Sequence, residues 1–364
     1  MKPRGVLEVP FYNGAGKSGQ SMPAQAAEDT TPDALIDEST STGRESNATE
    51  KHAVIAILAP AIAAAAALFA HKVLPNRQST FPTHHYPLLL EILLGAGILL
   101  AIAPALWPRL RRWTLHHAPL FAGAIAALEV WDLVTLKLAW MRLPYFPGPD
   151  MVFRGMIDDR AMLWESTWQS LILLLSGYSL GVAAGLASGI LIGWSRRARY
   201  WGMPVMKVVG PIPATAYIPL VMTMFSSAFF SGSALIALAV WFPMTMLTSS
   251  GIANVPVSFL DVARTLGAGR GYLIFRVAVP AALPSIFLGS FMGLGASFLT
   301  LIVAETVGVK SGLGWYLKWQ QGYLEYSKVY AALIIMAVFF SGLMTLLFKV
   351  RDRVLGWQKG VLRW

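Results

Sequence analysis

The feature that most constrains this chain is a series of apolar windows, each about 20 residues long, that begins near residue 53 and continues to about residue 350. A helix of that length crosses the hydrocarbon core of a membrane, which is about 30 Å thick. Lipid admits only helices and closed barrels, and the sequence lacks the short alternating segments of a barrel. Moreover, 55% of the residues are hydrophobic and only 13% are charged. The sequence therefore predicts an all-α polytopic membrane protein with about eight spanning helices.

The expected spans are residues 53–74, 87–107, 119–141, 167–194, 205–225, 233–252, 283–304 and 328–350. The fourth span carries glycine at every fourth position from Gly177 to Gly189, which favours close packing against another helix. The fifth span is interrupted by prolines, which remove backbone hydrogen bonds. Broken helices in transporters often lie near the pathway, although a loop followed by a half-helix also fits this pattern.

Basic residues gather near residues 109–112, 196–199, 264–276 and 349–363. With eight spans these places lie on one side of the membrane, and the positive-inside rule makes that side cytosolic. We therefore expect both termini in the cytosol. The net charge of +10 is explained by these loops and requires no nucleic-acid partner.

Other features exclude classes of function. The chain has no cysteine, so it forms no disulfide and no thiolate site. It lacks the GxxxxGK[ST] phosphate loop and therefore has no such ATP site of its own. No acid–base pair, triad or metal-ligand spacing stands out, so we expect no catalytic residue, no metal and no cofactor. Residues 1–50 are polar, show no signal peptide and are expected to form a disordered cytosolic tail.

Residues 256–282 form a charged, glycine-broken segment between two apolar runs. Ser258 and Asp261 are spaced as in a capping box, and Gly267 permits the positive φ that ends a helix. A second short helix is expected from Arg270 to Val277, ending at Pro280. The two helices would form a compact knob in the cytosol. A re-entrant loop on the lipid surface is the alternative.

This segment resembles the EAA motif of bacterial ABC importer permeases, which reads Glu-Ala-Ala, three residues, Gly, nine residues and Ile-x-Leu-Pro. The matching residues are Asp261-Val262-Ala263, Gly267 and Val277-Ala278-Val279-Pro280. The spacing is kept, with Asp for Glu at 261 and Val for Ala, Ile and Leu at 262, 277 and 279. Further matches within residues 119–364 resemble the subgroup that imports nitrate, sulfonates and taurine: Trp131-Asp132, Pro211-Ile212-Pro213, Ile218-Pro219-Leu220, Ala304-Glu305 and Ser311-Gly312-Leu313-Gly314.

The resemblance implies a type I importer of the bacterial inner membrane, carrying a small anionic solute. Its partners would be a second permease subunit (a homodimer), cytosolic ABC ATPase subunits and an extracytoplasmic substrate-binding protein. Residues 117–355 would be the permease domain, with a coupling segment at 256–282, two extra helices at 51–113 and a cytosolic tail at 356–364. The extra helices are expected to pack peripherally, so that deleting residues 1–107 spares ATPase binding. The residues implied to dock the ATPase are Ser258, Asp261, Ala263, Arg264, Gly267, Arg270 and Pro280.

Pathway candidates come from the broken span and from polar residues in the other spans: Pro211, Pro213, Thr215, Tyr217, Ser290, Ser297 and Glu305, with Ser170 and Thr245 as further hydroxyls. Glu305 either meets the binding protein or caps the loop that follows it. A secondary transporter or channel using Glu129 and Asp132 is the competing class, because intramembrane carboxylates on one helix face are functional candidates. A structural ion pair of these residues with Lys137 and Arg142 is the alternative for that pair.

Overall fold

The computed structural model describes residues 54–78 and 84–358. The tail expected at residues 1–50 lies outside the described residues, as does most of the tail expected at 356–364. The chain divides into two units, Met1–Ala56 and Ile57–Trp364. All contacts reported below lie within the second unit. In the described residues the secondary structure is helical, without strands.

Within residues 54–78 and 84–358, seven helices are long and apolar enough to span a membrane, and a bent pair makes an eighth if it counts as one span. The all-α, eight-span prediction is therefore confirmed. The spanning helices are Val54–Val73, α2 (His85–Leu106), α3 (Pro108–Asp132) with its π-helical end η1 (Leu133–Lys137), α5 (Arg160–Trp194), α8 (Ala228–Ala253), α11 (Val279–Val307) and α13 (Tyr326–Val354). The shorter elements are α4 (Pro149–Asp158), α6 (Arg196–Val209), η2 (Ala214–Tyr217), α7 (Ile218–Met224), α9 (Val257–Thr265), α10 (Arg270–Tyr272), η3 (Leu273–Ala278), α12 (Leu313–Gly322) and η4 (Gly356–Gln358).

Several spans begin earlier than the apolar pattern predicts, most clearly α3 and α5. α3 starts at Pro108, so the basic cluster expected in a loop lies in its first turns. Proline is favoured at the first helical position, where its missing N–H has no partner to lose. α5 starts at Arg160 and reaches 35 residues, because its polar first turns continue the helix beyond the apolar window.

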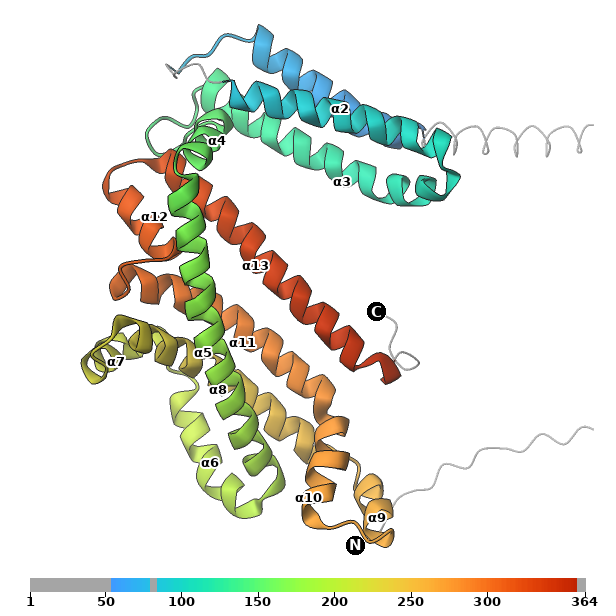
Figure 1. Ribbon diagram of the computed structural model, residues 1–364, viewed down its shortest axis with the longest axis vertical. Helices are drawn as coiled ribbons and strands as arrows, with labels where there is room; N and C mark the ends of the chain where they lie inside the picture. Colours follow the sequence, from blue (N-terminus) through green and yellow to red (C-terminus); the bar gives the residue numbers. More distant parts are fainter. Residues whose placement is uncertain (1–53, 79–83, 359–364) are drawn as a thin grey trace, which may run out of the picture. The chain divides into compact units, whose positions relative to one another are not determined.

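The core of the second unit is built on α8, which packs against both α5 and α11 (Figure 1). The glycine face of α5 lies on α8, as the spacing predicts. A Cβ atom added at Gly181 would lie 2.6 Å from the carbonyl oxygen of Ala237, and one added at Gly189 would lie 2.6 Å from Cβ of Thr248. Only glycine fits so close an approach of two helices.

The predicted break in the fifth span is present. α6 ends at Val209, and after Pro211–Pro213 the chain continues as η2 and α7 at an angle of 86° to α6. Many apolar side chains of this region are exposed, including Trp201, Val208 and Leu220. The bent pair therefore presents an apolar surface that no other part of the described chain covers.

The coupling segment keeps one predicted feature and departs in two. Gly267 adopts φ +84° and ends the turn after α9, as expected. The capping-box prediction is wrong, because Pro256 occupies the N-cap position and Ser258 lies inside the helix without a capping bond. The second short helix is not separate either. From Arg270 the chain runs through η3 into α11 as one helical span of 38 residues. The wider π-helical turn comes directly before Pro280, which has no N–H to donate.

Candidate functional site

The first helix of the coupling segment, α9, leaves its side chains outside the core. No residue of α9 is buried, and Leu266 is 83% exposed. Asp261 accepts a hydrogen bond of 2.8 Å from Arg264 one helical turn away. Exposed pairs of this kind contribute about 0–1 kcal/mol, so both groups remain available to a partner. The predicted docking residues fall into two sets: Ser258, Asp261, Arg264, Gly267 and Arg270 are exposed, whereas Ala263 and Pro280 are half-buried.

The segment is nevertheless attached firmly at its base. Leu260 packs against a buried cluster that includes Ile252, Val255 and Ala278. These residues belong to the end of α8, the loop after it and the start of the α11 span. A displacement of α9 would therefore be passed to both helices.

Two of the pathway candidates line a cavity of about 260 Å³ beside the broken span. Pro213 and Thr215 contribute to its wall together with Phe242 of α8 and Thr300 of α11. Pro211 is exposed next to it, and Tyr217 is half-buried outside its lining. The cavity is mostly apolar, with threonine hydroxyls as its polar side chains.

The remaining serine and threonine candidates serve helix packing instead. Ser290 is buried and donates to the carbonyl of Ile286, and Ser297 is buried and donates to Leu294. The Thr245 hydroxyl lies 2.7 Å from that of Ser188. The structure does not bring these hydroxyls into the cavity.

Glu305 holds the loop that follows α11. This residue is 1% exposed. Its carboxylate accepts a hydrogen bond of 2.6 Å from the Ser170 hydroxyl and another of 2.7 Å from the N–H of Gly314. Ser170 in turn accepts from the N–H of Leu313. Gly312 has φ +97°, and a Cβ there would overlap the Glu305 carboxylate. Of the two interpretations of Glu305, the geometry supports the loop cap. The pairing with Ser170, 135 residues away, carried no sequence signal.

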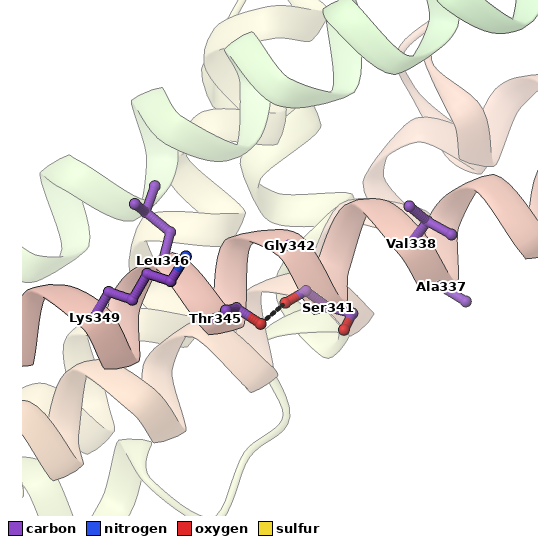
Figure 2. A pocket seen from close by; sticks show the side chains of 7 residues that line it. All are labelled: Ala337, Val338, Ser341, Gly342, Thr345, Leu346 and Lys349. Atoms are coloured by element: carbon purple, nitrogen blue, oxygen red, sulfur yellow. Dashed lines mark hydrogen bonds between the residues drawn. The ribbon is translucent and has the colours of Figure 1, made fainter. Parts of the chain in front are cut away.

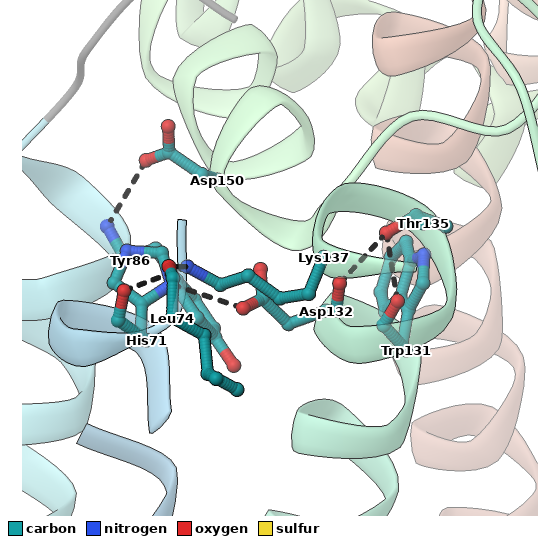
Figure 3. A network of polar contacts seen from close by, with 8 residues as sticks. All are labelled: His71, Leu74, Tyr86, Trp131, Asp132, Thr135, Lys137 and Asp150. Atoms are coloured by element: carbon teal, nitrogen blue, oxygen red, sulfur yellow. Dashed lines mark hydrogen bonds and ion pairs between the residues drawn. The ribbon is translucent and has the colours of Figure 1, made fainter. Parts of the chain in front are cut away.

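Asp132 pairs with a residue that the sequence did not suggest. Its Oδ2 lies 3.0 Å from Nδ1 of His71, and the side chain is fully buried (Figure 3). Lys137 donates instead to the backbone carbonyls of His71 and Leu74, at 2.7 Å each. The expected pairing with Lys137 and Arg142 is therefore wrong. Lysine at a helix C-terminus satisfies free carbonyls and complements the helix dipole, which explains its choice of partner.

The same junction joins the N-terminal helices to the rest of the chain at further points. The Gln78 amide donates to the carbonyls of Thr135 and Met141 and accepts from the N–H of Leu143. Asp150 of α4 accepts from the N–H of Tyr86 in the first turn of α2. Burial raises the pKa of the Asp150 carboxyl, and the Tyr86 N–H opposes that shift. We call these contacts the junction network, with His71, Gln78, Tyr86, Asp132, Lys137 and Asp150 as its members.

Glu129 and Asp132, the carboxylates within the third span, do not form a transport route. Both oxygens of Glu129 and one oxygen of Asp132 are buried without a hydrogen-bond partner in the part of the chain that the structure describes. Asp132 is enclosed by its own pair with His71. In residues 54–78 and 84–358 no group of three or more His, Asp or Glu side chains is placed to hold a metal ion.

A larger hollow, of about 700 Å³, runs along one face of α13 (Figure 2). Its lining includes Ser341, Gly342, Thr345 and Lys349, all from this one helix. The Thr345 hydroxyl donates to the Ser341 carbonyl 2.8 Å away. Because no polar groups from different elements converge here, the hollow is a helix-packing face and not a chemical site.

Comparison with known proteins agrees with this arrangement. Residues 161–355 match the family of binding-protein-dependent transport system inner membrane components. The chain is 30% identical to the taurine transport system permease protein TauC of Escherichia coli over 64% of this chain and 85% of that protein. It is 29% identical to the bicarbonate transport system permease protein CmpB of Synechococcus elongatus, over 66% and 88% respectively. A chain of the MetNI methionine ABC transporter matches 57% of this chain and 99% of its own length, with 18% identity and a TM-score of 0.46.

The match covers more than half of the chain, so this protein belongs to the family of inner membrane components of binding-protein-dependent transport systems. It is a permease subunit of an ABC importer, with a type I importer fold, and a protein of the inner membrane. The resemblance stated from the EAA-like motif is thereby confirmed. Importers of this kind work with an ATPase and a substrate-binding protein, and the secondary-transporter alternative is not supported.

Proposed function

We propose that the coupling segment, residues 256–282, binds an ABC ATPase subunit on the cytosolic side. The observation that carries the proposal is the contrast along α9 and its C-cap, where Leu260 is anchored in the core and Phe259, Val262 and Leu266 are exposed on one face. A monomeric soluble surface rarely exposes a contiguous apolar patch without a partner. The exposed pair of Arg264 and Asp261 on the same helix adds charges of both signs for specificity.

The helical span Arg270–Val307 gives the docked ATPase a way to act on the membrane. It has 38 residues and is therefore about 57 Å long at 1.5 Å per residue. Its N-terminal end belongs to the coupling segment, and its flank packs on α8. Closure of the ATPases would push on this end, and a continuous helix would carry the displacement across the membrane. ATP binding and hydrolysis would belong to the partner, since this chain has no phosphate loop.

The solute is proposed to be a small anion of the oxoacid type. Relatives are named for transport of taurine, which carries a sulfonate, and of bicarbonate. The cavity beside the broken span offers the hydroxyls of Thr215 and Thr300 rather than a permanent charge. Weak, uncharged contacts suit a pathway that must release its solute.

A second copy of this chain is proposed to complete the pathway, as a homodimer. Trp201 of α6 and Leu220 of α7 are exposed, and the segment between these two helices lines the cavity with Pro213 and Thr215. A partner covering this surface would bury them and enclose the cavity from its open side. The distribution of basic residues supports a cytosolic location of the coupling segment and both termini, with the substrate-binding protein on the opposite face.

Co-purification tests this function directly. The full-length permease should form a stable complex with the ATPase encoded beside its gene. Gly267→Arg and Asp261→Lys should each abolish that complex. Asp352→Lys reverses an exposed carboxylate, paired with Arg351, outside the segment, and should leave the complex intact. Solute flux through the permease alone, in vesicles without ATP, would contradict the proposal.

A further inference from the structure

A pocket of about 430 Å³ lies at the C-terminal end of α11, between that end and α12. Its polar side chains are Lys310, Lys318 and Thr306, and its wall includes Trp315, Trp319 and Tyr323. Pockets of this volume bind small molecules. Resting on the proposed function, we propose that this α12 pocket receives the oxoanion on the side opposite the ATPase and passes it towards the broken span.

The charge of the pocket is uncompensated. Lys310 and Lys318 make no ion pair and no hydrogen bond within the part of the chain that the structure describes. Three other lysines are engaged: Lys72 with Glu91, Lys137 with backbone carbonyls and Lys328 with Asp159. Two free ammonium groups beside one concave surface attract an anion before it enters the membrane.

The α12 wall of the pocket, which carries Lys318, is held in place from behind. On the inner face of α12, Tyr316 and Gln320 both donate to Asp159, which also pairs with Lys328 at 3.2 Å. Burial, together with the neighbouring Asp159, raises the pKa of Tyr316 and keeps it a donor. At the start of α12, Gly314 donates to Glu305. The outer face of α12 is thus a fixed platform.

The aromatic side chains on that platform form a continuous ladder. Trp315 stacks on Trp319 with ring centroids 5.4 Å apart, and Trp319 lies 5.3 Å from Tyr323. The spacing of four residues places all three on one helix face. Such a wall suits the organic portion of a sulfonate while the lysines hold its charge.

The location of the pocket supports a transport role. The span Arg270–Val307 begins in the coupling segment and ends at this pocket, so the two lie at opposite ends of one helix. Val307 and Gly308 also line a narrow cavity of about 10 Å³, together with Met222 of α7. About two to three turns back along α11, Ala296 and Thr300 line the cavity that contains Thr215. Three cavities therefore follow one another along α11 beside the broken span.

The competing explanation is an interfacial belt of lysine and aromatic residues, which anchors a helix at the membrane surface and binds no solute. The absence of native cysteine makes a direct test possible. Gly322 lines the pocket, and a Cβ added there would meet no atom within 4 Å. Gly322→Cys therefore reports on the pocket, and Tyr323→Cys supplies a second reporter.

The full-length cysteine variants are placed in nanodiscs at low salt. The quantity measured is the rate at which the cysteine reacts with the anionic reagent 2-sulfonatoethyl methanethiosulfonate. Taurine and sodium hydrogencarbonate serve as probes, with sodium chloride at equal ionic strength as the reference. We expect each probe to slow the reaction. Lys310→Gln and Lys318→Gln should each lower the unprotected rate about threefold, the effect of one unit charge some 6 Å away in water. Together they should abolish protection, whereas Lys349→Gln on α13 should change neither quantity.

Equal rates with and without both probes, in the presence of both lysines, would overturn the proposal in favour of the interfacial belt. Protection that persists in the double lysine variant would also overturn it. The same variants are then tested for the ATPase complex. Loss of that complex would contradict the proposed function, whereas an intact complex without protection contradicts only the α12 pocket.

Discussion

The junction network and the coupling segment use the same kinds of side chain in opposite ways. In the junction network, Asp132 and Lys137 are buried and bonded to residues more than 60 positions away. In the coupling segment, Asp261 and Arg264 are exposed and pair within a single helical turn. Removing one partner of a buried pair costs about 3–5 kcal/mol, whereas an exposed pair contributes about 0–1 kcal/mol. The first region thus holds the protein together, and the second is left free for a partner.

The largest expected effect is that of deleting residues 1–107. The deletion removes His71 and Gln78 and leaves Asp132 and Lys137 buried without their partners. We expect a loss of about 3–5 kcal/mol of stability, measured by thermal unfolding in detergent, with the ATPase complex retained. Replacing Asp132 and Lys137 by leucine in the truncated protein should recover part of the loss. If the truncated protein is as stable as the full chain but cannot bind the ATPase, the junction network does not hold the protein together, and the comparison is contradicted.

A single substitution, Lys137→Met, is expected to have the next largest effect. It keeps the aliphatic stem and removes the donor to the carbonyls of His71 and Leu74. Hydrogen bonds to charged groups contribute about 1.5–3 kcal/mol each, so we expect a loss of about 3 kcal/mol in unfolding free energy. The matched control is Lys72→Met, which breaks the exposed pair with Glu91 and should cost at most about 1 kcal/mol. Equal losses would show that burial does not distinguish the two lysines.

A pair of double-mutant cycles measures the contrast itself. Alanine substitutions at His71 and Asp132, singly and together, should give a coupling energy of about 1–2 kcal/mol, because the hydrogen bond is buried. The equivalent cycle for Asp261 and Arg264 should give about 0.3–0.5 kcal/mol, as for other helical surface pairs. Unfolding by denaturant provides both values. A larger coupling energy for Asp261 and Arg264 than for His71 and Asp132 would mean that the exposed pair stabilises the fold.

The smallest effect is expected at the turn after α9. Gly267 has φ +84°, where an L side chain costs about 1–2 kcal/mol, and a Cβ there meets no other atom. Gly267→Ala should therefore increase local opening of α9, seen as faster amide hydrogen exchange, without changing global unfolding. Gly269→Ala is the control, since that residue has the same free space but φ −73°. Similar exchange in both variants would remove the conformational role of Gly267.

Local chemistry made much of this protein predictable. Apolar windows, helix-breaking prolines and the four-residue glycine spacing depend on neighbouring residues alone, and they correctly predicted the spans, the bend after α6 and the face of α5 that meets α8. The positive φ of Gly267 follows the same rule. The Ser258 cap failed although its spacing was right, because the N-cap position is occupied by Pro256, two residues before Ser258.

Reasoning from local patterns could not predict which side chains contact each other when they lie far apart in the sequence. The sequence by itself determined that this is a helical membrane protein and that the chain turns at Gly267 after a short helix, because both depend on short-range patterns. Only the tertiary structure decided that Asp132 meets His71, that Glu305 meets Ser170, and that two lysines and three aromatic side chains line one pocket at the end of α11. Contacts between residues far apart in the chain are set by the packing of whole helices, which no local pattern records.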